Sequence, residues 1–259
     1  MKNIKPLKRF GQNYLIDKNV IANIVSVISP KKYEKIIEIG PGKGALTQEL
    51  YNLNKNLICF EIDNRVIDAL KSEFNDIEII NQDFLKADLQ FYLNPNTIIV
   101  GNIPYNITSP ILFKLIYEHE LIGDVVLMVQ NEVANRLIAK PRTKDYGILS
   151  VILNYFADVF YCFKVPPTCF YPKPKVDSAV IKISFKKNLN TDFNSKLFIK
   201  VIKACFGNRR ETLKNSLRNS EFSAFDFSSV DFDFSRRAEE LLVDDYLLLT
   251  KIIENNGII

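Results

Sequence analysis

The sequence predicts an α/β protein, with a Rossmann-like domain followed by a small helical domain. Short runs rich in β-branched residues alternate with segments of helical spacing over the first two thirds of the chain, and this alternation is typical of a parallel sheet covered by helices on both faces. Beyond Lys187 the β signal stops. A chain of 259 residues with 47% hydrophobic and 25% charged residues is globular rather than disordered or fibrous.

We expect five apolar runs to form parallel strands, each followed by a helix. They lie at 35–39, 56–61, 77–81, 97–101 and 124–129. A helical segment follows Gly147 and runs to about residue 157. Two later β-rich runs, 159–163 and 178–185, are expected to form an antiparallel hairpin at the sheet edge, joined through the proline-rich loop 166–174.

The polar stretch 188–192 reads as a linker, and residues 194–254 as several short helices. We therefore expect one domain over 1–187 and a second over 188–259. No run approaches the ~18 apolar residues that a membrane helix needs, and the amino end leads into no apolar signal region. These patterns predict a cytoplasmic protein that does not contact the membrane.

Cysteine and histidine are too scarce for several kinds of chemistry. The four cysteines are scattered and form no CxxC pair, so we expect reduced thiols rather than a disulfide framework. The only histidine is His119, in a polar stretch. A histidine-based triad or a metal site is not expected.

The net charge of +4 conceals an uneven distribution. Residues 186–218 hold nine basic and two acidic side chains, a local excess of +7, whereas 221–245 hold two basic and eight acidic ones, or −6. The amino end is basic before any acid appears. Basic clusters of this kind could steer a phosphate backbone, which suggests contacts with a nucleic acid. The candidates are Lys5, Lys8, Arg9, Lys203, Arg209, Arg210 and Lys214.

The segment 38–47 carries several glycines directly after a predicted strand and opens a helix. Glycines such as Gly40 and Gly42 let a backbone turn sharply and approach a ligand. The loop lacks the Gly-Lys-Ser/Thr ending of a phosphate-binding loop, so ATP or GTP hydrolysis is not expected. Glu61 ends the next strand nineteen residues past Gly42, where a carboxylate can accept both ribose hydroxyls. NAD and S-adenosylmethionine sites share this arrangement.

The ends of the third and fourth strands favour S-adenosylmethionine. Asp83 and Phe84 could hydrogen-bond an adenine amino group and pack against its ring. Residues 102–105, Asn-Ile-Pro-Tyr, could present acceptors to an exocyclic amine while the tyrosine stacks on the base. All these strand ends should converge at one edge of the sheet. An NAD-dependent oxidoreductase would leave Asp83 and this turn without a function.

At this point the sequence resembles the KsgA/RsmA-type small-subunit rRNA adenine dimethyltransferases, relatives of the Erm resistance methyltransferases. The matching segments are 10–15, 38–47, Glu61, Asp83, 102–105 and 165–178. The stretches 109–113, 130–137 and 144–150 look like the KsgA branch rather than the Erm branch. Residues 205–215 are similar to the family's basic motif, although Glu211 interrupts the basic run.

The resemblance implies a Rossmann-like S-adenosylmethionine-dependent methyltransferase and a set of site residues. Asn102 and the main chain of Pro104 would hold the target amine, and Tyr105 and Phe170 would clamp the adenine. The implied cofactor-binding residues are Gln12, Asn13, Leu15, Gly40, Gly42, Glu61, Ile62, Asp83, Phe84 and Asn102.

The implied reaction is dimethylation of two adjacent adenines in a loop near the 3′ end of 16S rRNA, during ribosome biogenesis. The implied partner is small-subunit rRNA within an immature 30S subunit, bound by a monomer without a metal. A second interpretation remains open, in which the protein is a ribosome-assembly factor whose essential output is binding.

Overall fold

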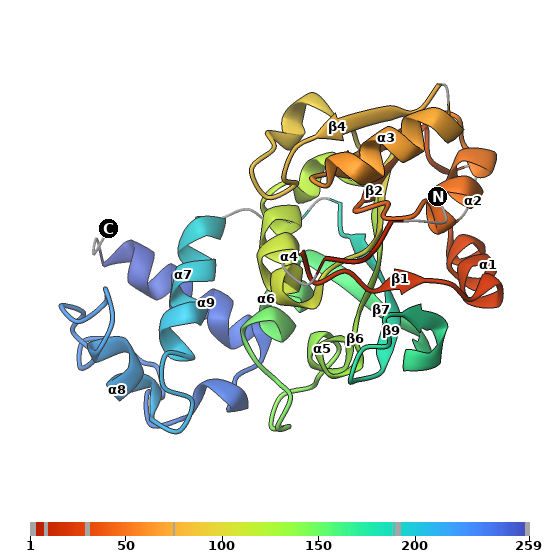
Figure 1. Cartoon of the computed structure of the whole chain (residues 1–259). Helices are drawn as coiled ribbons and strands as arrows, with labels where there is room; N and C mark the ends of the chain where they lie inside the picture. The colour runs from red at the N-terminus through yellow and green to blue at the C-terminus, as the bar shows by residue number, and fades with distance from the viewer. Residues whose placement is uncertain are drawn as a thin grey trace. The chain divides into compact units, whose positions relative to one another are not determined.

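The computed structural model describes residues 4–7, 10–28, 32–74, 76–187, 189 and 193–256, and the chain divides into two compact units (Figure 1). The first unit comprises residues 1–134 and 158–185, and the second comprises 135–157 and 186–259. The sequence placed 135–157 in the first domain. The structure instead groups this segment with the carboxyl-terminal helices.

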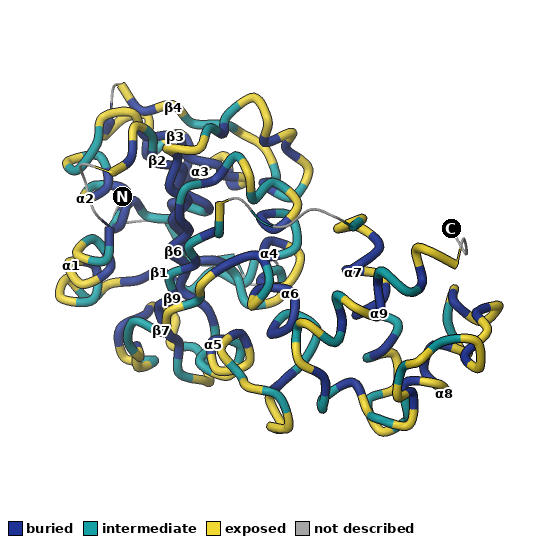
Figure 2. Tube along the Cα trace, turned by 180° about the vertical axis from the view of Figure 1, so that it is seen from behind, coloured by how far each residue is buried: buried dark blue, intermediate teal, exposed yellow. Residues whose placement is uncertain are grey.

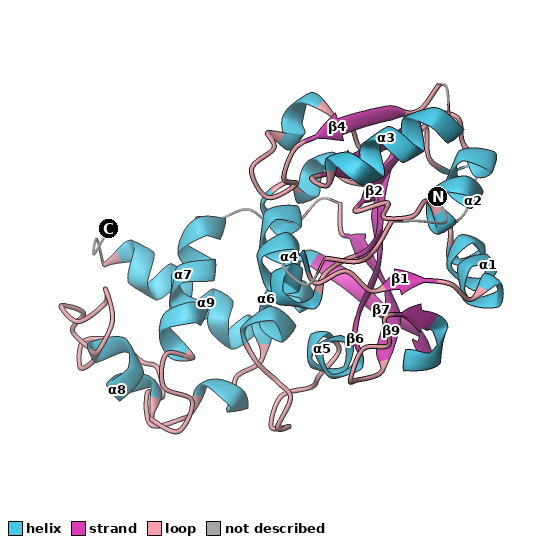
Figure 3. Cartoon of the chain, viewed as in Figure 1, coloured by secondary structure: helices cyan, strands magenta, loops and turns pink. Residues whose placement is uncertain are grey.

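A seven-stranded sheet forms the centre of the first unit (Figure 3). Its order is β4-β3-β2-β5-β6-β9-β7, and the first five strands of this order are parallel to their neighbours, whereas β9 runs antiparallel to β6. The predicted parallel strands are confirmed, and β7 lies at the edge beside β9. The bounds are β2 Lys35–Ile39, β3 Leu57–Glu61, β4 Glu78–Asn81, β5 Thr97–Asn102, β6 Asp124–Gln130, β7 Ala157–Val165 and β9 Ser178–Phe185.

Three helices pack against one face of this sheet: α1 (Lys18–Val27), α2 (Ala45–Leu53) and α3 (Asn64–Glu73). Each contributes aliphatic side chains at helical spacing to a core that also includes alternate residues of β2, β3, β5 and β6. Strands β2, β3, β5 and β6 are buried along nearly their whole length, and the centre of the sheet is accordingly dark blue in Figure 2. In the same unit, α4 (Thr108–Tyr117) follows β5, and α5 (Asn131–Leu137), whose last residues fall in the second unit, follows β6.

A separate two-stranded sheet, which the sequence did not predict, joins β1 (Tyr14–Leu15) to β8 (Phe170–Tyr171). The strands are antiparallel, with Tyr14 opposite Tyr171 and Leu15 opposite Phe170. Leu15 and Phe170 belong to the main core. This pairing anchors the amino-terminal segment to the first unit.

The second unit consists of helices: α6 (Ile148–Phe156), α7 (Ser195–Cys205), α8 (Leu213–Arg218) and α9 (Val243–Asn255). α7 packs against the other three. The Tyr146 hydroxyl, buried just before α6, donates a hydrogen bond of 3.0 Å to the carbonyl of Leu241. Such contacts explain why 135–157 groups with this unit. Short 3₁₀ helices occur at Leu89–Phe91, Tyr105–Ile107, His119–Leu121, Pro167–Cys169 and Ala238–Glu240.

Within the described part of the chain, no helix has the length and apolarity required to cross a membrane. The four cysteines are free, and Cys59, Cys169 and Cys205 are buried. No group of three or more potential metal-ligating side chains occurs among the residues described.

Candidate active site

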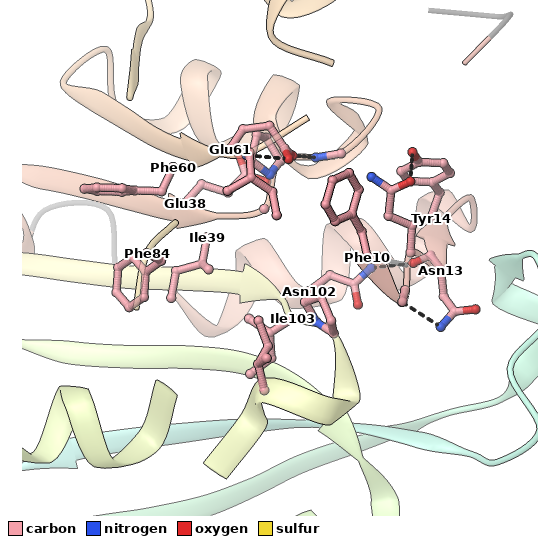
Figure 4. Close-up of a pocket in the computed structure, with 18 of the residues that line it drawn as sticks. Phe10, Asn13, Tyr14, Glu38, Ile39, Phe60, Glu61, Phe84, Asn102 and Ile103 are labelled. Atoms are coloured by element: carbon pink, nitrogen blue, oxygen red, sulfur yellow. Dashed lines mark hydrogen bonds between the residues drawn. The ribbon is translucent and has the colours of Figure 1, made fainter. Parts of the chain in front are cut away.

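A cavity lies at the carboxyl ends of β2, β3, β4 and β5 (Figure 4). Strand order reverses at β2, which has β3 on one side and β5 on the other. Open α/β sheets bind ligands at such a switch point, beyond the carboxyl ends of the strands. The cavity is lined by all the residues predicted to bind the cofactor: Gln12, Asn13, Leu15, Gly40, Gly42, Glu61, Ile62, Asp83, Phe84 and Asn102.

The loop from β2 to α2 forms one wall of the cavity. Gly40 and Gly42 have φ angles of 67° and 53°, in the left-handed region that favours glycine. A Cβ atom at Gly42 would also lie 3.0 Å from the ring of Tyr14. The glycines therefore allow the main chain to pass close to a ligand and to the amino-terminal residues 10–15, which are called the arm below.

Glu61 ends β3 and is 6% exposed. Its Oε1 accepts hydrogen bonds from the main-chain N–H groups of Ile62, at 2.8 Å, and Asp63, at 2.9 Å. From the described residues, Oε2 accepts only a long bond of 3.4 Å, from the N–H of Gly42. Burial raises the pKa of this carboxyl group, and the N–H donors partly offset that effect. Oε2 is therefore the oxygen with capacity to accept ligand hydroxyls.

The next wall combines apolar surface with one acid. Ile62 lines the cavity although 45% exposed. Phe84 is buried and packs edge-on against Phe60, with ring centroids 5.3 Å apart. Asp83 accepts a hydrogen bond of 2.9 Å from the N–H of Leu85, which fixes its carboxylate. A flat heteroaromatic ring with an amino group fits this wall.

Glu38, which the sequence analysis gave no role, is a second buried acid lining the cavity, at 1% exposure. Its Oε2 lies 3.6 Å from Cys59 Sγ. Burial is the main cause that raises the pKa of Glu38 to about 7. Among the described residues, neither Glu38 nor Glu61 forms an ion pair with a lysine or arginine. Two buried acids without such partners favour a cationic ligand.

The amino-terminal arm closes one side of the cavity. Gln12 Oε1 accepts hydrogen bonds of 2.8 Å from the N–H of Leu7 and from the hydroxyl of Tyr14. Burial, aided by the nearby acids Asp63 and Glu61, raises the pKa of Tyr14 to about 12, so this hydroxyl remains a donor. The arm is thus held in place by its own hydrogen bonds and by the pairing of β1 with β8.

The Asn-Ile-Pro-Tyr turn follows β5 and reaches the same cavity, as Figure 4 shows for Asn102. Asn102 Nδ2 donates a hydrogen bond of 2.9 Å to the carbonyl oxygen of Asn13. The Tyr105 hydroxyl forms a hydrogen bond of 2.6 Å with Ser178 Oγ, which is buried at the start of β9. Pro104 also lines the cavity. The structure thus brings together three of the four residues predicted to be catalytic.

The fourth, Phe170, is not among the residues that line the cavity. Its side chain is 2% exposed and packs in the core. The pairing of β8 with β1 directs Phe170 inward and its neighbour Tyr171 outward, because successive strand residues face opposite sides. Stacking of the Phe170 ring on a base therefore stays a prediction, and it would require this side chain to leave its core position.

The basic candidates fall into different environments. Lys5 is exposed, and Lys8 and Arg9 lie outside the described residues. In the second unit, Arg210 and Lys214 are exposed, and Lys203 lines a polar groove along α7 and α8.

Arg209, in contrast, is used inside the second unit. Its Nε donates to Glu239 Oε2 at 2.5 Å, and its terminal nitrogens donate to the carbonyls of Lys144 and Thr143 at 2.5 and 3.0 Å. These bonds use three of the five guanidinium N–H groups, and the side chain remains 39% exposed. Arg209 thus joins the 143–144 loop to Glu239, and its contact with RNA stays a prediction.

The residues that line the cavity fit S-adenosyl-L-methionine. Its ribose needs an acceptor such as Glu61 Oε2, its adenine needs the Asp83 and Phe84 wall, and its sulfonium and ammonium groups suit a cavity containing buried acids. The doubly wound sheet with this cavity defines a class of protein, the S-adenosyl-L-methionine-dependent methyltransferases. Comparisons with known proteins agree and specify the class further.

The family model for ribosomal RNA adenine dimethylase matches residues 3–255. Ribosomal RNA small subunit methyltransferase A of Francisella tularensis subsp. novicida (strain U112) is 41% identical over 256 residues, covering 96% of this chain and 98% of that protein. The chain belongs to the ribosomal RNA adenine dimethylase family. The predicted fold class, cofactor and type of enzyme are confirmed, in preference to the NAD-dependent alternative.

Solved structures give the same result. A dimethyladenosine transferase from Plasmodium falciparum superposes with a TM-score of 0.78 at 26% identity, covering 94% of this chain and 98% of that one. The 23S rRNA methyltransferase ErmE superposes with a TM-score of 0.66 at 28% identity, covering 93% and 100%. The structural relatives therefore include an Erm methyltransferase as well as a dimethyladenosine transferase.

Proposed function

We propose that the protein transfers methyl groups from S-adenosyl-L-methionine to the exocyclic amines of two adjacent adenines in a loop near the 3′ end of 16S rRNA. The product is dimethyladenosine, formed during small-subunit biogenesis. The hydrogen bond from Asn102 to Asn13 carries the proposal, because it leaves Asn102 Oδ1 as the acceptor for an amine. The small-subunit assignment is supported by the name of the Francisella relative.

When bound, the cofactor supplies an electrophilic sulfonium methyl group. Glu61 Oε2 accepts the ribose hydroxyls, and Ile62, Asp83 and Phe84 bind the adenine. The glycine loop around Gly40 and Gly42 borders the methionine portion. The arm residues Gln12, Asn13 and Leu15 cover the site and exclude water from it.

Asn102 and Pro104 act on the target amine. The amine is a weak nucleophile because its lone pair is delocalised into the purine ring. Hydrogen bonds from its two N–H groups to Asn102 Oδ1 and the Pro104 carbonyl localise that lone pair and aim it at the methyl group. Positioning of this kind contributes ~7–11 kcal/mol in favourable cases. The proton leaves to water after transfer, so no strong base is required.

Tyr105 stacks on the extruded adenine, with its ring oriented by Ser178. Stacking on an aromatic ring offsets the cost of removing a base from its neighbours by ~1–3 kcal/mol per base. An unpaired loop adenine is the least costly target. A pocket that still admits the monomethylated amine allows the second transfer.

The basic residues that remain exposed bind the RNA backbone. Lys5 serves on the first unit, and Lys203, Arg210 and Lys214 on the second. Lys8 and Arg9 are predicted to join Lys5. Affinity should fall with salt because each neutralised phosphate releases counterions. The partner is an immature 30S subunit in the cytoplasm, bound by a monomer.

The proposal is tested by incubating the protein with labelled cofactor and either small-subunit or large-subunit ribosomal precursors. Label should enter the small-subunit RNA. Label confined to the large-subunit RNA would assign the protein to Erm-like chemistry, and label in neither would reject the proposal.

A further inference from the structure

Tyr171 is an unusual exposed aromatic residue beside the active site. Its side chain is 58% exposed, whereas that of the preceding residue, Phe170, is 2% exposed. The pairing of Tyr171 with Tyr14 places it directly beside a residue that lines the cavity. Because Phe170 is anchored in the core, the backbone that carries Tyr171 is fixed in place, and the Tyr171 ring is open to solvent.

Lys43 connects this ring to the cavity. It belongs to the glycine loop and lines the cavity. Its Nζ lies 5.0 Å from the ring centroid of Tyr14 and 5.9 Å from that of Tyr171. Among the described residues, Lys43 forms no ion pair. The ammonium group therefore lies near both rings and has no carboxylate to neutralise it.

The loop that follows continues the positive charge. Lys173 and Lys175 are both exposed. The acid of this segment, Asp177, is paired with Lys164 at 2.7 Å. The loop lysines are thus not balanced by their nearest acid in sequence. Tyr171 and Lys43, together with the exposed Lys173 and Lys175 two and four residues after Tyr171, are here called the rim.

An aromatic face with adjacent ammonium groups suits a nucleotide. Bases of any identity stack on an aromatic ring, and ammonium groups bind the phosphates that connect them. If one adenine enters the cavity toward Asn102, the strand must continue over the cavity's edge. We infer that the rim binds the nucleotides flanking the target adenine, with a neighbouring base on Tyr171 and its phosphate near Lys43. This inference rests on the proposed function.

An acidic protein would use the lysines of the rim but would gain little from the flat ring. The discriminating measurement is therefore the contribution of the ring itself. Fluorescence anisotropy measures how tightly an unmodified small-subunit rRNA transcript binds to the full-length protein. The contribution of the ring to this affinity separates an RNA partner from an acidic protein partner. The variants are Tyr171→Ala and Tyr171→Phe, with Tyr117→Ala as a control, because Tyr117 is 53% exposed on the same unit at the carboxyl end of α4.

Tyr171→Ala should weaken RNA binding about tenfold, as expected for the loss of one stacked base. Tyr171→Phe and Tyr117→Ala should stay within twofold of the unmodified protein. Removing the flanking base from the RNA should abolish the difference between Tyr171→Ala and the unmodified protein, which a merely structural effect would not do. Lys43→Gln should lower the slope of log affinity against log salt by about one.

Equal RNA affinity for Tyr171→Ala and the unmodified protein would overturn the inference, and so would a tenfold loss that persists with the abasic RNA. Methyl transfer by the unmodified protein is assayed in parallel. Transfer to small-subunit RNA together with an unaffected Tyr171→Ala variant rejects only the rim. Absence of transfer rejects the proposed function, whatever the binding result.

Discussion

The side chain of Asn102 and the main chain of Asn13 are joined by a hydrogen bond of 2.9 Å across 89 positions of sequence. The bond fixes the amide so that Nδ2 faces the arm and Oδ1 remains for another donor. It also links the turn after β5 to the arm that lines the cavity. Folding of the arm and orientation of the Asn102 amide are therefore coupled.

Asn102→Ala should lower the rate of methyl transfer about 100- to 1000-fold, since it removes an acceptor aimed at the reacting amine. Cofactor affinity should change far less than the rate. Single-turnover transfer and calorimetric cofactor binding measure the two. The exposed Asn106 provides a control, because Asn106→Ala leaves the cavity-lining amide in place. A rate within tenfold of the unmodified protein would refute the role of Asn102.

Glu61→Gln should weaken cofactor binding about 10- to 100-fold. The neutral amide loses charge-assisted hydrogen bonds to the ribose hydroxyls. Isothermal titration with S-adenosyl-L-methionine checks this, with the exposed Glu73→Gln as the matched control. Unchanged affinity for Glu61→Gln would show that the ribose lies elsewhere.

Glu38 should make stability depend on pH. Burial raises its pKa from 4.5 to about 7, so between these values the folded protein keeps a proton that the unfolded chain releases. Stability should therefore fall as pH rises from about 5 to 7, by up to ~3 kcal/mol, and then level off. Glu38→Gln removes this contribution. Urea unfolding at pH 5 and pH 8 measures the free energy of unfolding of the unmodified protein and of Glu38→Gln. The same difference between the two proteins at both pH values would contradict this prediction.

Tyr105→Phe and Ser178→Ala should each slow methyl transfer about fivefold, because each removes the same 2.6 Å hydrogen bond that orients the Tyr105 ring. The double variant should be no slower than either single variant. Multiplicative effects in the double variant would mean that the two residues act independently.

Neighbouring arginines should behave differently. Arg209→Ala should destabilise the second unit by about 1–2 kcal/mol, since it breaks the bonds to Glu239 and the 143–144 loop. Arg210→Ala should leave stability unchanged and reduce the salt dependence of RNA binding. Denaturation measures the stability of each variant, and RNA titration at several salt concentrations measures its RNA binding. A loss of stability in Arg210→Ala, with a change only in RNA binding for Arg209→Ala, would contradict the prediction.

The parallel strands were predictable because buried strands read as nearly continuous apolar runs, as in Lys35–Ile39 and Thr97–Asn102. The β1 and β8 pair was not, since each strand has two residues and its partner lies far along the chain. The grouping of 135–157 with the second unit depends on contacts such as Tyr146 with Leu241, 95 positions apart.

The cavity was predictable because topology alone brings the ends of parallel strands to one edge. The burial of Phe170 and the internal hydrogen bonds of Arg209 could not be predicted. A shift of one residue in strand register exchanges inside and outside, so sequence cannot decide between Phe170 and Tyr171 for the exposed position. Adjacent arginines likewise give no sign of which one binds Glu239.

The most direct test of the central claim is mass spectrometry of small-subunit rRNA after reaction with the unmodified protein and with Asn102→Ala. We predict dimethyladenosine at two adjacent adenines near the 3′ end for the unmodified protein and only traces for the variant. Methylation at any other position, or equal dimethylation by both proteins, would contradict the account.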